Sequence, residues 1–169
     1  MSNLILSADF IGQIVGVFPL VLAYFVFLFN SRRKIILFKT ASDLLWALHF
    51  FLMGAMSGAL VNLLNTVRDI VFFQKEKKWC QHTFIPVFFC TLTLFCAILS
   101  GDGLKSIFPC IGSCLAVIGF WCSSPENIRK FNLPAALLWL IYGIITGSFS
   151  TILCNSLSIV SIILPKKHC

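Results

Sequence analysis

Two amide and two charged side chains interrupt a largely apolar run from residue 57 to residue 73, SGALVNLLNTVRDIVFF. They are Asn62, Asn65, Arg68 and Asp69. A carboxylate that changes its protonation state inside an apolar helix bundle is a natural site for proton coupling, and a neighbouring arginine can pair with it. The cost of keeping these charges depends on the solvent around the run, which the composition indicates.

The composition is that of a membrane protein. Of the 169 residues, 59% are hydrophobic and 11% are charged, against roughly 45 to 50% and about 25% in soluble domains. The chain has too few polar residues to cover a soluble core. Its apolar runs are long enough to cross a hydrocarbon layer, which takes about 20 helical residues. The sequence therefore predicts an integral membrane protein with the lipid bilayer as its main partner.

Seven apolar runs of helical length account for nearly the whole chain and leave no room for a soluble domain. The first run lacks a basic n-region and exceeds the h-region length of about 7 to 15 residues, so it is not expected to be a cleaved signal. The predicted helices cover about 10–29, 35–55, 57–73, 83–100, 104–122, 131–146 and 148–164.

Basic residues indicate the orientation of these helices, because positive charge in short loops marks the cytoplasmic side. Twelve of the thirteen Lys and Arg residues fall on one side, including Lys166 and Lys167, and Lys105 falls on the other. We therefore expect the N-terminus outside and the C-terminus in the cytoplasm. Because the charges are dispersed over loops, the net charge of +7 does not indicate nucleic-acid binding.

Cysteine and histidine placement predicts neither disulfides nor a metal centre. Most of the eight cysteines lie inside predicted helices, and none forms a CxxC pair, which favours thiols used as small apolar residues. A metal site would need clustered His and Cys ligands, and His49, His82 and His168 do not provide them. No cofactor is expected.

An internal repeat of about 90 residues divides the chain into three helices, one linker helix and three helices. We predict an all-α membrane protein with two parallel three-helix bundles at 1–79 and 104–169, joined by a linker helix at 80–103. Parallel repeats are one of the standard transporter designs. The matched residues are Pro19 and Pro109, Gly54 and Gly143, Gly58 and Gly147, and Asn65 and Asn155.

The repeated prolines and glycines are hinge candidates. Pro19 and Pro109 interrupt helical hydrogen bonding, which a membrane tolerates where neighbouring groups satisfy the backbone, and they can act as gating hinges or as fixed bends. The two GxxxG matches, GAMSG and GIITG, can make tight turns through positive φ. They can also allow close helix packing, and this leaves a homo-oligomer open.

A second carboxylate lies deep in the neighbouring predicted helix. At about 1.5 Å per residue, Asp43 lies about 12 Å from the cytoplasmic end, where an unpaired carboxylate is expensive. An ion pair between Asp43 and Arg68 would lower the cost for both residues. The alternative is a protonated Asp43, with Arg68 reaching toward the interface. Asp43, Arg68 and Asp69 are therefore candidates for a buried ion pair or a proton-coupling site.

Three segments carry a resemblance to a known family: NSRRKIILFKTASDLLW, LHFFLMGAMSGALVNLLNTVRDIVFF and LWLIYGIITGSFSTIL. With the pattern HFFxxGxxxGAxxNxxNxxR, most of the chain resembles the YgjV-type family of bacterial inner-membrane proteins. The layout of three, one and three helices is similar to that of SWEET sugar transporters and other PQ-loop proteins. The PQ dipeptide is absent, since Phe-Pro stands at Pro19 and SPEN at 124–127.

The SWEET resemblance implies a central pocket. Asn65 and Asn155 would contribute amides from the third helix of each bundle, and His49 and Trp139, sixteen residues earlier, would pack against the solute. Amides and flat aromatic faces suit a small polar or zwitterionic solute. The alternatives are hydrogen bonding between helices for the asparagines, core or lipid contact for Trp139, and a structural role for His49.

These features favour a small-solute transporter over two other classes. A non-transporting structural or biogenesis partner in the inner membrane is the alternative, and it would be favoured if the bundle had no central cavity. An enzyme is not expected, because catalysis would need a nucleophile with a base or a metal cluster. The candidate nucleophiles Ser57, Ser113 and Ser150 have no histidine nearby in the sequence.

Overall fold

A computed structural model describes residues 2–26, 32–122 and 125–163, and this part of the chain is helical, without strands. The basic residues Lys166 and Lys167, with the C-terminus, lie outside the described residues. Two short 3₁₀ helices, Lys78–Gln81 and Gly103–Ser106, lie in the connections. The seven α-helices are α1 (Ser2–Val26), α2 (Arg32–Leu52), α3 (Met56–Phe73), α4 (Phe84–Leu99), α5 (Ile107–Cys122), α6 (Pro125–Thr146) and α7 (Phe149–Ile163).

The seven predicted helices are all found, and two of them begin at least six residues earlier than expected. Helix α1 begins at Ser2 rather than near residue 10. Helix α6 begins at Pro125 rather than near residue 131. Proline is well suited to the first helical position, because a backbone N–H there has no acceptor within the helix and its absence costs no hydrogen bond. The polar residues that follow it continue the helix, although they do not belong to an apolar run.

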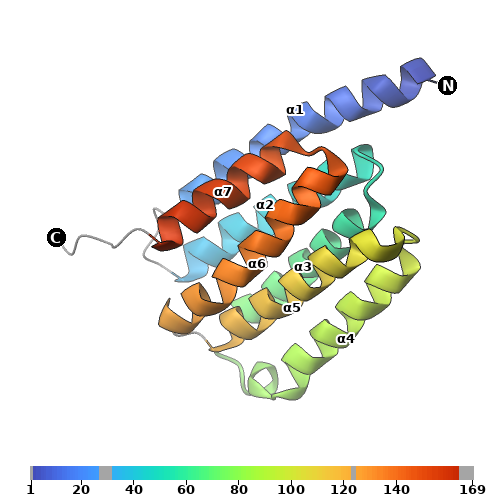
Figure 1. The fold of residues 1–169 in the computed structure, drawn as a ribbon. Helices are drawn as coiled ribbons and strands as arrows, with labels where there is room; N and C mark the ends of the chain where they lie inside the picture. Colours follow the sequence, from blue (N-terminus) through green and yellow to red (C-terminus); the bar gives the residue numbers. More distant parts are fainter. Residues whose placement is uncertain (1, 27–31, 123–124, 164–169) are drawn as a thin grey trace.

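Six of the helices form a closed ring (Figure 1). Helix α2 packs between α1 and α3, and α6 packs between α5 and α7. Contacts of α3 with α5 and of α1 with α7 close the ring on its two sides. Helix α4 lies outside the ring, against α3 and α5. The ring therefore surrounds a common interior to which α4 does not belong.

The turns from α2 to α3 and from α6 to α7 have the same backbone geometry. Gly54 and Gly147 adopt positive φ angles of 67° and 68°, which glycine does without a steric penalty. At each turn the amide after the glycine donates to a carbonyl five residues earlier, from Ala55 to Phe50 and from Ser148 to Gly143, both at 2.9 Å. This is the hydrogen bond of a Schellman motif.

The turns relate the two halves by 93 residues, the separation of Gly54 and Gly147, rather than by the displacement of about 90 seen in the sequence. Three residues are close to one helical turn of about 3.6 residues, so both alignments select the same helix face. The 93-residue register changes which residues correspond. It pairs Trp46 with Trp139 and Asn62 with Asn155.

Of the remaining glycines in the two GxxxG motifs, Gly58 lies at a tight helix contact. A Cβ atom added at Gly58 would lie 2.8 Å from Phe50 and 2.8 Å from Tyr142. A Cβ atom at Gly143 would lie 3.0 Å from Thr151. Each GxxxG motif thus has one glycine in a turn and one at a close contact inside the bundle.

The two repeated prolines are both buried but hold different helical positions. Pro19 lies inside α1, and its carbonyl oxygen accepts a hydrogen bond from the Ser42 hydroxyl at 3.0 Å. This hydrogen bond connects α1, at the position of its internal proline, to α2. Pro109 is the third residue of α5, where the backbone N–H would have no intrahelical acceptor.

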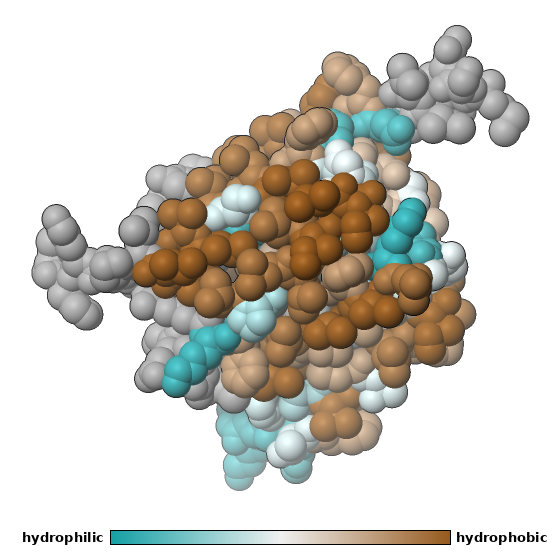
Figure 2. Space-filling model, in the orientation of Figure 1, coloured by the Kyte–Doolittle hydropathy of each residue, from teal (hydrophilic) through white to brown (hydrophobic). Residues whose placement is uncertain are grey.

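The polar and apolar residues are distributed in the inverse of the pattern found in soluble proteins. Large apolar side chains are exposed, such as Leu104 at 82% and Phe149 at 77%, whereas Arg68 is 1% exposed. Hydrophobic residues cover most of the face in Figure 2. By length and composition, Arg33–Leu52 and Gly103–Trp121 could each cross a membrane. Shorter apolar helices are Asp9–Ala23, Phe84–Leu99, Lys130–Thr146 and Phe149–Ile163.

Candidate functional site

A cavity of about 500 Å³ lies inside the ring, and all six ring helices line it. Its wall extends from Phe50 and Thr151, close to the two glycine turns, to Ala23, Ile35 and Ile162. The latter residues lie where α1 and α7 end and α2 begins. The cavity therefore extends toward the end of the bundle that the charge distribution predicts to be cytoplasmic.

Three asparagines present unused hydrogen-bonding groups at the cavity wall. The Nδ2 atoms of Asn62 and Asn155 each donate to the carbonyl four residues earlier, to Gly58 at 2.8 Å and Thr151 at 2.9 Å. Within the described structure, the amide oxygens of Asn62 and Asn155 have no hydrogen-bond partner. The side-chain amide of Asn132 on α6 has none either. These groups can bind a polar solute, because amides both donate and accept.

Asn65 has a different environment from the other cavity amides. Its oxygen accepts hydrogen bonds from Arg68 Nη1 at 2.9 Å and from the Ser113 hydroxyl at 2.5 Å. The second bond links α3 to its ring neighbour α5 and so joins the two halves of the chain. Asn65 therefore lines the cavity and also holds the arginine and the two helices in place.

The charged residues form one network on α2 and α3. Lys39 Nζ donates to both carboxylate oxygens of Asp43, at 2.7 and 2.8 Å. Arg68 donates from Nε and Nη2 to Asp69 Oδ1, at 2.9 and 2.7 Å. Arg68 Nη2 also lies 3.6 Å from Asp43 Oδ2. The expected Asp43 and Arg68 contact is thus one part of a four-residue network that also contains Lys39.

The charges of the network lie beside an aromatic ring from the opposite half of the chain. Lys39 Nζ lies 5.8 Å and the Arg68 guanidinium carbon 5.7 Å from the centre of the Phe120 ring on α5. Both distances allow a cation–π interaction. Lys39, Asp43, Arg68 and Phe120 all line the cavity, whereas Asp69 does not. Asp69 Oδ2 is buried without a hydrogen-bond partner.

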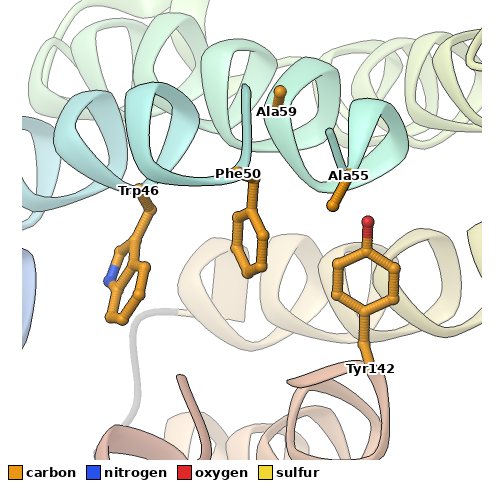
Figure 3. Packing of buried hydrophobic residues seen from close by; sticks show 5 residues of the cluster. All are labelled: Trp46, Phe50, Ala55, Ala59 and Tyr142. Carbon is orange, nitrogen blue, oxygen red and sulfur yellow. The ribbon is translucent and has the colours of Figure 1, made fainter. Parts of the chain in front are cut away.

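Aromatic side chains form the cavity wall near the glycine turns. Figure 3 shows Trp46 and Phe50 extending from α2 toward α6, and Tyr142 extending from α6 in the opposite direction. The Phe50 ring centre lies 5.9 Å from that of Trp46 and 5.8 Å from that of Trp139. Trp139 lines the cavity together with Trp46, its partner in the 93-residue register.

His49 lies behind this aromatic wall and does not line the cavity. Its Nδ1 atom lies 2.7 Å from the Gly12 carbonyl oxygen, and its Nε2 atom lies 2.7 Å from the Ser148 hydroxyl. The side chain is fully buried. His49 therefore connects α2 to α1 and to the start of α7. The pairing of a histidine with a serine was not foreseen from the sequence, because 99 residues separate the two.

Tyr142, which corresponds to His49 in the 93-residue register, connects α6 to the other half of the chain. Its hydroxyl lies 2.8 Å from the Ser57 hydroxyl and accepts a hydrogen bond from the Gly58 amide at 2.9 Å. The backbone amide and hydroxyl of Ser57 both donate to Asp102, at 2.7 and 2.6 Å. These contacts hold the two halves together at the end of the bundle opposite the end toward which the cavity extends.

The structure brings five of the seven predicted solute-binding and ion-pair residues to one cavity, and His49 and Asp69 are the exceptions. Asn65, Asn155, Trp139, Asp43 and Arg68 line it. Sequence reasoning missed other lining residues, and a signal existed for three of them: Lys39 precedes Asp43 by four residues, and Trp46 and Asn62 lie 93 residues before Trp139 and Asn155. Asn132 gave no signal. In the described ranges, no group of three or more His, Cys, Asp or Glu side chains could hold a metal ion.

A helical bundle with an apolar exterior, and with charged and amide side chains facing an interior cavity, is typical of a membrane protein. Residues 10–165 match the family Imp-YgjV, described as bacterial inner membrane protein, and the chain belongs to this family. The inner membrane protein YgjV of Escherichia coli (strain K12) is 20% identical over 168 residues, which cover 92% of this chain and 86% of that protein. No solved structure matches the chain.

Proposed function

We propose that this inner-membrane protein is a transporter for a small polar solute. The carrying observation is the cavity of about 500 Å³ between the helices of the two halves. Buried amides and charges are expensive in a membrane protein, and they commonly mark substrate or ion pathways. A cavity lined by side chains from both repeats is also the usual location of a transporter site.

The helix arrangement supports a SWEET-like layout of three, one and three helices. In this proposal the chain spans the membrane seven times, with the N-terminus outside and the C-terminus in the cytoplasm. The matching glycine turns at Gly54 and Gly147 support parallel repeats, and the position of α4 outside the ring supports a linker role. Asp43 and Asp69 are the carboxylates that could couple transport to protons.

Reporter fusions test the proposed topology. A reporter that is active only in the cytoplasm should be active when fused after Lys78 and at the C-terminus, and it should be inactive after Asp102, since basic loops stay in the cytoplasm. A periplasmic reporter should give the reverse pattern. Cytoplasmic activity after Asp102 would contradict the seven-span arrangement.

Flux measurements test the transport proposal directly. Purified protein in liposomes, presented with a mixture of amino acids, polyols and small amides, should admit at least one solute faster than protein-free liposomes do. Mass spectrometry of the vesicle contents identifies the solute, and thermal unfolding verifies that the reconstituted protein is folded. If folded protein admits none of the mixture, the proposal fails, and a structural or biogenesis role in the inner membrane becomes the better account.

A further inference from the structure

The cavity walls contributed by the two halves carry different charges. The charged wall consists of Lys39, Asp43 and Arg68. In the 93-residue register its three counterparts are uncharged: Asn132, Ala136 and Ser161. All six residues line the same cavity. A solute in the cavity therefore meets both signs of charge on one side and only neutral groups on the other.

The charges of the network on α2 and α3 balance. Lys39 pairs with Asp43, and Arg68 pairs with Asp69, so two cations face two anions. A solute with a net charge would add an uncompensated charge to a space of low dielectric constant, where desolvation is costly. A solute with one positive and one negative group adds no net charge, and each of its groups can lie beside a wall charge of the opposite sign.

The charged wall has free hydrogen-bonding capacity for such a solute. The Lys39 ammonium has three N–H donors and uses two on Asp43. Arg68 has five donors, and its hydrogen bonds to Asp69 and Asn65 use three. The remaining donors suit a carboxylate, while the Asp43 oxygens can accept from an ammonium group.

We propose that the solute is a small zwitterion of the amino-acid type, held by its carboxylate at Lys39 and Arg68 and by its ammonium group at Asp43. The rest of the molecule lies toward Asn132 and Asn155 on the opposite wall. The cavity has room for a molecule of this size. This inference rests on the proposed transport function for its physiological meaning, but the binding itself can be measured separately.

Binding to four charge forms of one molecule tests the proposal. The probes are the free amino acids and, for each that binds, its cationic amide, its anionic N-acetyl form and its neutral N-acetyl amide. Ligand-induced thermal stabilisation of the purified full chain in detergent gives the affinities. At least one free amino acid should bind, and each capped form should bind at least about tenfold more weakly, because it leaves a charged partner unpaired.

Charge-pair variants give a second test. Lys39→Gln combined with Asp43→Asn removes one cation and one anion together and keeps hydrogen-bonding groups in the wall. This double variant should fold and should lose at least about tenfold in affinity for the zwitterion. Arg33→Gln combined with Glu76→Gln removes an exposed ion pair that does not line the cavity. It is the matched control and should bind within about threefold of the original chain.

The outcomes separate the solute class from the transport function. A capped form that binds as tightly as the free amino acid, or the absence of binding by every free amino acid to folded protein, overturns the zwitterion proposal. Unchanged affinity in the double variant overturns it as well. If a polyol or neutral amide is transported and no zwitterion binds, the transport proposal stands and the zwitterion proposal fails. If a zwitterion binds but no solute is transported, the zwitterion proposal stands and the transport proposal fails.

Discussion

Asn155→Ala is expected to lower solute flux by about tenfold to a hundredfold while leaving the fold intact. The Asn155 oxygen has no partner within the described structure, and its Nδ2 atom bonds only to its own helix. Removal of the amide leaves a solute group unpaired, which costs about 1 to 3 kcal/mol of binding. Flux into vesicles and the thermal unfolding midpoint are measured on the same preparation.

Asn62→Ala and Asn65→Ala provide an internal comparison. Asn62 corresponds to Asn155 and should behave like it. Asn65 also holds Arg68 and Ser113, so Asn65→Ala should lower both flux and the unfolding midpoint. Thr91→Ala is the matched control, because Thr91 bonds within α4, outside the ring. If Asn155→Ala unfolds the protein while flux per folded molecule stays normal, the amide is structural.

Asp43→Asn is expected to destabilise the protein by about 3 to 5 kcal/mol, the usual result of removing one partner from a buried ion pair. Asp43 contacts two cations, Lys39 at 2.7 Å and Arg68 at 3.6 Å, and the substitution leaves both with less compensation. Denaturant unfolding in detergent micelles measures the loss. The loss of unfolding free energy for Asp43→Asn combined with Arg68→Gln should be smaller than the sum of the losses for the two single variants.

A double-mutant cycle quantifies this coupling. Contacting charges in one network show coupling energies of about 0.5 to 3 kcal/mol. The coupling should be larger for Asp43 with Lys39 than for Asp43 with Arg68, since Lys39 bonds both carboxylate oxygens. Arg33 with Glu76 is the matched control, because this ion pair is largely exposed and exposed pairs contribute little. Strictly additive losses for both Asp43 pairs would show that the network does not act as a unit.

The helices could be predicted from sequence because each of them contains a long run of mostly apolar residues. The same reasoning misplaced the start of α6, where the polar residues after Pro125 continue the helix. The turns also set a repeat register of 93 residues, which the matching residue types alone had put near 90. Hydrogen bonds at Gly54 and Gly147 determine that register. Residue identities alone match at both displacements, so the sequence could not decide between them.

The site was only partly predictable because the composition of a cavity depends on which helix faces meet. His49 and Trp46 are three residues apart on α2, yet only Trp46 lines the cavity. The positions of α1 and α7 decide this, since they supply the partners of His49. The pairing of Lys39 with Asp43 follows a spacing of four residues that is known to bring helical side chains together, so sequence reasoning could have found it.

The balanced network of Lys39, Asp43, Arg68 and Asp69 has an electrical consequence. Moving one elementary charge across a membrane potential of 100 mV involves about 2.3 kcal/mol. Two cations and two anions that shift together through the field do no net electrical work. While both carboxylates are ionised, rearrangement of the bundle around its cavity would then be insensitive to voltage with the cavity empty, and a bound zwitterion would leave it insensitive.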